Sequence, residues 1–201
     1  MHHLHNSSQR SQHHQSSQNT SNPCTDTLTD IDYLDHMIPH HQVAIDMSHA
    51  LQATHITSPT ILHLCRNIIR KQDYEIWEMT MMKQQLSTSV FHHVKGVTDK
   101  ATTKMEVYNP YIGKAHCNPL FFDPEAHHKH MQHQTITIQS YLKHMIPHHQ
   151  VAVDMSKRLL LHTNHSYLMD FCRKLIIDQQ YEIATMKDLL RDSYLYESCL
   201  V

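Results

Sequence analysis

Residues 33–48 read YLDHMIPHHQVAIDMS, and residues 141–156 read YLKHMIPHHQVAVDMS. Fourteen of the sixteen positions are identical, and the two differences are Asp35 against Lys143 and Ile45 against Val153. A second match follows each stretch, because CRNIIRKQDYEIWEM at 65–79 aligns with CRKLIIDQQYEIATM at 172–186. The chain therefore contains an internal repeat, and the residues retained in both copies mark what both copies need.

Each copy predicts a pair of helices. Thr29, with Asp32 three residues later, is typical of a capped helix start, and Ser58 before Pro59 is typical of a second start. Only two glycines occur in 201 residues, which disfavours a fold rich in tight β-turns. We therefore expect an all-α protein, a four-helix bundle made of two repeated helical hairpins joined by a long linker.

The sequence divides into four segments. Residues 1–27 form a His-, Ser- and Gln-rich tail with little to bury, which predicts disorder. The first hairpin spans 28–87, a linker spans 88–122, and the second hairpin spans 123–201. Asp123-Pro124 predicts the start of a helix through His133, although the β-branched run at 135–138 disfavours continuity. Asn164 or Ser166 is the expected cap of the last helix.

Composition excludes several classes of protein. The formal net charge is −2, so no basic surface for nucleic acid is expected. Five cysteines without a CxxC pair indicate neither a disulfide framework nor a zinc finger. The first residues lack the apolar stretch of a signal peptide, and no run is long and apolar enough to span a membrane. We expect a soluble, intracellular protein.

Histidine is the most unusual component. The chain holds 23 histidines and 12 methionines. Imidazole is the commonest protein ligand for transition metals, and thioether sulfur is a soft donor that favours copper(I). The composition therefore indicates metal binding, with copper(I) as the preferred ion.

Helical periodicity gathers these donors on single faces. At about 100° per residue, Met37, His40, His41 and Met47 fall within an arc of roughly 120° on the first helix, and the second copy repeats this. Gln72, Glu75, Met79 and Met82 share a stripe with Cys65 on the next helix. The predicted metal ligands are Met37, His40, His41, Met47, Glu75, Met79, Met82, Met145, His148, His149, Met155, Glu182 and Met186.

A proline precedes each His-His pair, at Pro39 and Pro147. Proline in a helix interior removes one backbone hydrogen bond and costs about 3 kcal/mol. We expect either a kink that re-aims the following turn or a helix that begins at the proline. Retention of that cost in both copies indicates that geometry is being set at the His-His step, and a purely structural kink is the alternative.

The motif HMIPHHQVAIDM, followed by Q-x-x-E-I-x-x-M and present twice, resembles domain of unknown function family 305. The resemblance covers about 28–87 and 132–192, and it implies a ferritin-like four-helix bundle and copper binding. Carried over by position, it marks the predicted histidines and methionines except Met82, together with Gln72, Glu75, Gln179 and Glu182. The chain departs from the family at Cys65 and Cys172, where a small residue is usual, and in lacking the signal peptide of exported members.

Several alternatives remain open at this point. The histidines could form a metal-free hydrogen-bonded core with Gln72, Gln179, Glu75 and Glu182, and the methionines and cysteines could be core filler. His36 and His144 lie at the edge of the helical arc. The group His127, His128, His130, Met131 and His133 could be a peripheral site or an exposed polar face, and the exposed face is favoured.

The predicted function is binding of copper(I), or silver(I), for sequestration or transfer, with no reaction catalysed. The alternative is a structural or interaction module. A di-metal oxidase is disfavoured because such sites need about four inward carboxylates. Only Glu75 and Glu182 face inward here. Metal ions are the expected partners.

Overall fold

The computed structural model describes residues 28–54, 56–88, 118–132, 134–161 and 163–198. Over these ranges the regular structure is entirely helical, which confirms the all-α class. The elements are α1 (Asp30–Gln52), α2 (Pro59–Thr88), a 3-10 turn η2 (Pro119–Phe121), α3 (Pro124–Met131), α4 (Ile138–Leu159) and α5 (Ser166–Ser198). The predicted tail and most of the predicted linker lie outside the described residues.

Short polar side chains begin the first helix of each repeat. The Thr29 hydroxyl accepts a hydrogen bond from the backbone N–H of Asp32 at 3.1 Å, and the Thr137 hydroxyl accepts one from Ser140 at the same distance. Ser140 also accepts from the Thr137 backbone, which completes a capping box. In each helix the cap therefore satisfies one of the backbone N–H groups that the first turn leaves unpaired.

The helix that follows Asp123 is shorter than predicted. Asp123 caps it by accepting from the Ala126 N–H at 2.9 Å, as its sequence suggested. It ends at Met131 and does not reach His133, and α4 begins separately at Ile138. The extended backbone of Thr137 (φ −116°, ψ 162°) separates the two helices, consistent with the β-branched run before it.

Both internal prolines lie inside continuous helices. Pro39 lies within α1 and Pro147 within α4. The alternative in which a helix begins at each proline is therefore wrong. The His-His pairs stand in the middle of their helices, directly after a residue that has no N–H to donate.

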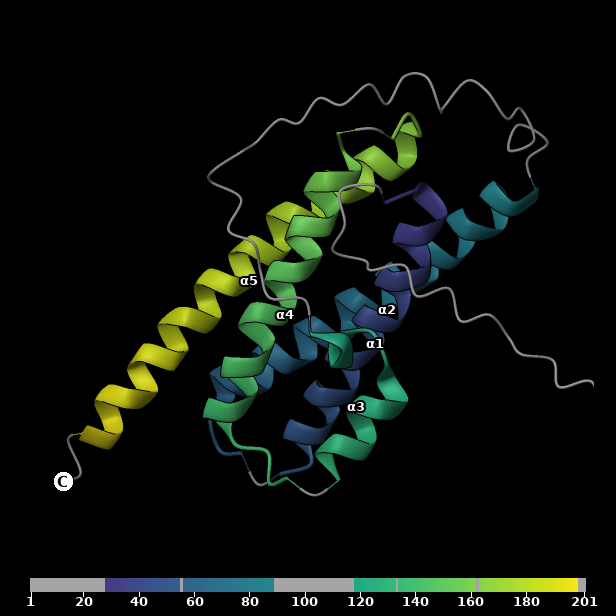
Figure 1. Cartoon of the computed structure of the whole chain (residues 1–201). Coiled ribbons are helices and arrows are strands. Elements are labelled where there is room, and N and C mark those ends of the chain that lie inside the picture. Colours follow the sequence, from purple (N-terminus) through teal and green to yellow (C-terminus); the bar gives the residue numbers. More distant parts are fainter. Residues whose placement is uncertain (1–27, 55, 89–117, 133, 162, 199–201) are drawn as a thin grey trace, which may run out of the picture.

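The helices pack in a simple pattern (Figure 1). α1 packs against α2, α4 against α5, and α1 also packs against α4 and α3. The hydroxyls of Tyr33 and Ser156 lie 2.7 Å apart, as do those of Tyr141 and Ser48. The start of each central helix thus meets the end of the other, so α1 and α4 run antiparallel. No described helix is both long and apolar enough to cross a membrane.

Candidate metal centre

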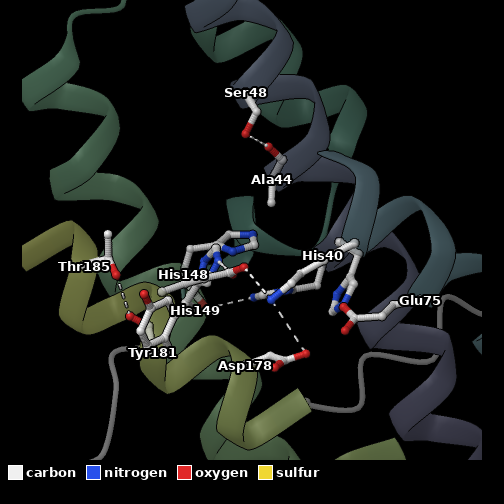
Figure 2. Close-up of polar contacts among 12 residues, drawn as sticks. His40, Ala44, Ser48, Glu75, His148, His149, Asp178, Tyr181 and Thr185 are labelled. Atoms are coloured by element: carbon white, nitrogen blue, oxygen red, sulfur yellow. Dashed lines mark hydrogen bonds and ion pairs between the residues drawn. The ribbon is translucent and has the colours of Figure 1, made fainter. Parts of the chain in front are cut away.

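Four histidines meet where α1 and α4 cross. His40, His41, His148 and His149 are each completely buried. The rings of His40 and His148 stack with centroids 3.6 Å apart and planes 28° apart. Figure 2 shows His148 and His149 facing His40 across the crossing, with Glu75 beside them. The two repeats therefore bring their imidazoles together in the interior.

Each repeat also pairs one histidine with a glutamate from its second helix. His41 Nε2 lies 2.8 Å from the Glu75 carboxylate, and His149 Nε2 lies 3.0 Å from that of Glu182. In each pair the ring N–H donates to the carboxylate. His40 similarly donates from Nε2 to the carbonyl oxygen of His148, at 3.1 Å. In the neutral form of each of these three rings, the bond holds the proton on Nε2 and leaves a lone pair on Nδ1.

Those lone pairs have no protein partner. Nδ1 of His40, His41 and His149 and both ring nitrogens of His148 are buried without a hydrogen-bond partner. An unsatisfied buried polar atom costs about 1–3 kcal/mol. Burial, and then the neighbouring imidazoles, hold the pKa of His40 and of His148 well below the ordinary value. Both rings stay neutral near pH 7, which is the form that binds metals.

The second glutamate differs from the first in its surroundings. Lys71 on α2 lies 3.3 Å from Glu182 and 3.7 Å from Asp178, both on α5. Burial alone would raise the pKa of Glu182. The His149 hydrogen bond and the Lys71 charge outweigh burial and hold that pKa below its usual value. The His149–Glu182 pair therefore has a cation beside it already.

The methionines fall into two buried groups. One group joins Met37, Met79, Met82 and Met155 within one apolar cluster. The other joins Met47, Met145 and Met186 within a second cluster. Each group takes most of its members from one repeat and one from the other, since Met155 crosses into the first and Met47 into the second. Two corresponding sets of thioethers, four in one and three in the other, thus belong to the two halves of the core.

All thirteen predicted ligands are buried. Their role as ligands stays a prediction. Over the described ranges, no three side chains among His, Cys, Asp and Glu converge as a metal-holding set. The imidazoles instead come together as pairs and stacks, in a core that is otherwise rich in thioethers.

Sequence reasoning missed the aromatic cover of the centre. Phe121 contacts His148 edge-on with ring centroids 5.0 Å apart, and Phe122 lies 5.2 Å from His40. Both residues belong to the end of the predicted linker. The Pro-Leu-Phe-Phe sequence at 119–122 was the available signal, because an adjacent aromatic pair is rarely left in solvent.

The two repeat cysteines are free and buried. Burial raises the pKa of the Cys172 thiol to about 12 and also raises that of Cys65. Near pH 7 both are protonated thiols, which are poor nucleophiles. Cys172 lies in the cluster that holds Met37, and Cys65 in the one that holds Met47.

The peripheral histidines divide into two kinds. His128 and His130 are exposed, as expected of a polar face, whereas His127 is only 2% exposed. The favoured interpretation of this group as an exposed face is therefore wrong for His127. His133 lies outside the described residues. His144 packs against His127, while His36 bonds to the Asp32 carbonyl at 2.6 Å.

Fold and centre together define an all-helical protein whose two central helices cross at a buried histidine cluster flanked by methionines. The chain belongs to the family described as "Domain of unknown function (DUF305)", whose pattern matches residues 30–190. No curated protein is detectably similar to it.

Solved structures of similar fold include a metal-bound protein. CopM in its Cu(I)-bound form is 28% identical with a TM-score of 0.58, and the match covers 83% of this chain and 98% of that one. CopM in an Ag-bound form, obtained by soaking, is 26% identical with a TM-score of 0.58, covering 83% and 97%. A DUF305 fragment from Deinococcus radiodurans is 20% identical with a TM-score of 0.57, covering 81% and 95%. That last likeness shows the fold alone.

Proposed function

We propose that this protein binds copper(I), and silver(I) in its place, through the histidine and methionine side chains at the α1–α4 crossing. It holds or hands on the ion and catalyses no reaction. In this proposal α1–α2 and α4–α5 are two hairpins of one four-helix bundle, each built from one copy of the repeat. Their shared interior is the binding region.

The observation that carries the proposal is the set of buried imidazole nitrogens without a partner. Nδ1 of His41 and of His149 are both left free by an Nε2–H bond to a glutamate. A carboxylate that holds one nitrogen of a histidine while the other binds metal is the usual arrangement at protein metal sites. The contacts of Glu75 and Glu182 thus favour a role in orienting the imidazoles and raising their basicity. The sequence had instead suggested that these glutamates bind the metal directly.

The donor set favours a soft monovalent ion. Imidazole and thioether dominate the interior, and the buried carboxylates of Glu75 and Glu182 are already engaged by histidines. Magnesium, calcium and manganese prefer oxygen ligands, whereas copper(I) selects thioethers. A di-iron oxidase would also need about four inward carboxylates, whereas the described residues place only Glu75 and Glu182 beside the buried histidines.

The comparisons point in the same direction. Structures of CopM exist in Cu(I)-bound, Cu(II)-bound and Ag-bound forms, and the match spans nearly all of that chain. The identities of 26–28% leave the individual ligands to be established on this chain. The proposal for this protein therefore depends on its own buried nitrogens, and CopM supports the choice of metal.

Anaerobic titration against a competing copper(I) chelator tests the proposal. The variant with His40, His41, His148 and His149 changed to alanine should lose most of the copper(I) uptake of the wild type while circular dichroism shows it still helical. A matched control changes four exposed histidines, namely His49, His63, His128 and His130, and should keep the uptake. Equal uptake by the core variant and the wild type would refute the assignment.

One rival function has a specific observation in its favour. No three His, Cys, Asp or Glu side chains within the described ranges already form a metal-holding set. A structural module with a hydrogen-bonded histidine core would look the same in this respect. This rival predicts that the core variant and the variant of exposed histidines take up equally little copper(I). The buried histidines would then serve packing alone.

A further inference from the structure

A second pair of unpartnered imidazoles lies outside the central four. His127 on α3 is 2% exposed, and its Nε2 is buried without a hydrogen-bond partner. His144 on α4 also has a buried Nε2 without a partner. The two rings are tilted by 58° with centroids 5.2 Å apart. Two nitrogen atoms are therefore left unsatisfied on adjacent rings.

Over the part of the first half that the structure describes, this pair has no counterpart. His36 occupies the repeat position of His144, but its Nδ1 bonds to the Asp32 carbonyl at 2.6 Å and its ring packs edge-on against Phe122. The partner of His144 comes from α3, which lies outside both copies of the repeat. Among the described residues, the pair therefore arises from a helix that lies outside the repeated stretches.

We propose that His127 and His144 form a second, outer binding site for a soft monovalent cation such as copper(I) or silver(I). The proposal adds a site to the binding function proposed above and rests on it for the choice of metal. Two imidazole nitrogens suffice for these ions, which accept two ligands in a near-linear arrangement. Zinc, by contrast, takes four ligands at structural sites, so the outer site discriminates against it.

Met131 can supply a third donor. It lies one helical turn after His127 on α3, at the i, i+4 spacing that places two side chains on one face. It is half-buried and packs against the apolar cluster that holds Met47 and Met145. A thioether at this position would raise the affinity for copper(I) and silver(I) without helping zinc.

The outer pair connects to the central histidines by ring contacts. His144 stacks on His148 with centroids 5.9 Å apart and planes 30° apart, and His148 stacks on His40. Phe121 packs edge-on against both His144 and His148, at 4.9 Å and 5.0 Å. The outer pair therefore continues the row of stacked rings from the buried centre to α3.

Silver(I) binding by the full chain in the presence of a competing thioether ligand tests the proposal, because competition removes weak surface binding. His127→Phe keeps an aromatic ring against His144 but has no nitrogen. We expect it to bind one silver ion fewer than the wild type. The matched control His128→Ala changes the exposed neighbour on the same helix and should keep the wild-type stoichiometry.

Adding His127→Phe to the four-alanine variant of the central histidines separates the outer site from the proposed binding at the central histidines. That variant should retain one silver ion, and adding His127→Phe should remove it. Nitrogen NMR of the imidazoles should show the His127 and His144 signals shifting with silver(I) and unchanged with zinc. Retention of the full stoichiometry by His127→Phe, or equal loss in His128→Ala, would overturn the outer site while leaving the central one intact.

Discussion

At the scale of single residues, two tyrosine hydroxyls join the repeats by hydrogen bonds. Tyr141 lies 2.7 Å from Ser48, and Tyr33 lies 2.7 Å from Ser156, with all four side chains fully buried. Each bond joins the first helix of one repeat to the first helix of the other. These contacts hold α1 and α4 in the register that brings the four histidines together.

Removing one of these hydroxyls should therefore lower the free energy of unfolding by a measurable amount. Tyr141→Phe deletes the bond to Ser48, but that serine still donates to the Ala44 carbonyl at 2.8 Å. The hydroxyl also bonds to the Cys65 thiol, which is a weak hydrogen-bonding group. We therefore expect a loss of about 1 kcal/mol in the free energy of unfolding, mostly from the bond to Ser48. Urea unfolding measures it. Tyr181→Phe, at a site 72% exposed, is the control and should change stability by less than about 0.5 kcal/mol.

The central imidazoles also make the stability of the metal-free protein depend on pH. Burial, and then neighbouring imidazoles, place the pKa of His40 and His148 well below 6.5 and lower that of His144 to about 4. Below about pH 6.5 the unfolded chain binds protons at these residues that the folded chain does not. The free energy of unfolding should therefore fall as pH falls through that value.

Denaturant unfolding of the metal-free protein at several pH values between about 7.5 and 5.5 measures this slope. His148→Phe removes one of the shifted groups and should flatten the decline. His128→Ala, in which the imidazole is exposed, should leave it unchanged. An equally steep decline in His148→Phe would show that other groups cause it.

At the same scale, helical periodicity predicted which side chains are buried but not what they touch. The arc on α1 correctly placed Met37, His40 and His41 inward, because period alone determines a face. The bonds of His41 to Glu75 and of His40 to the other repeat depend on how two helices approach, which periodicity does not contain. His127 was placed by preference on an exposed face, because its segment occurs once and no second copy marked it.

At the scale of elements, local capping chemistry decided most boundaries. Thr29 and Asp123 cap α1 and α3 as the sequence suggested. The cap of α5 differs from both expected residues: the Leu168 N–H donates to Nδ1 of His165, at 3.2 Å. Imidazole is not among the preferred N-cap groups, so propensity pointed to its neighbours.

The α2–α5 contact makes the two His–Glu pairs unequal. Lys71 forms ion pairs with Glu182 and Asp178, and its repeat-equivalent position on α5 is Asp178 itself. Glu182 therefore has a lysine beside it, whereas an aspartate occupies the matching position of the other repeat. A bound cation beside His149 would be repelled by Lys71. The His41–Glu75 side should therefore bind copper(I) more tightly than the His149–Glu182 side.

Lys71→Gln tests this inequality by removing the charge without adding a sulfur ligand. We expect the weaker copper(I) affinity to rise by about 2- to 10-fold, because a half-exposed charge contributes on the order of 1 kcal/mol. Competitive titration resolves the two affinities. Lys174→Gln removes an equal charge that lies over the Tyr74 ring, and it should leave both affinities unchanged.

At the scale of the whole molecule, the two repeats form a nearly symmetric interior with an asymmetric exterior. Reciprocal tyrosine–serine bonds and the exchange of Met47 and Met155 between the clusters relate the two halves. α3 and η2 break that relation by covering one side of the centre with His127 and Phe121. The sequence repeat predicted the symmetric part, whereas these covering segments carry no periodic signal.

Because the proposed ligands come from both repeats, metal should stabilise the folded chain as a unit. A ligand that binds only the folded state adds about 2.7 kcal/mol to its stability when present at a hundredfold excess over its dissociation constant. Silver(I) should therefore raise the thermal midpoint of the wild type in a single cooperative transition. The four-alanine variant of His40, His41, His148 and His149 should show most of that rise lost, since only the outer pair remains. A wild-type midpoint that ignores silver(I) would favour the metal-free structural core, because no ligand can bind the folded state tightly and leave its unfolding temperature unchanged.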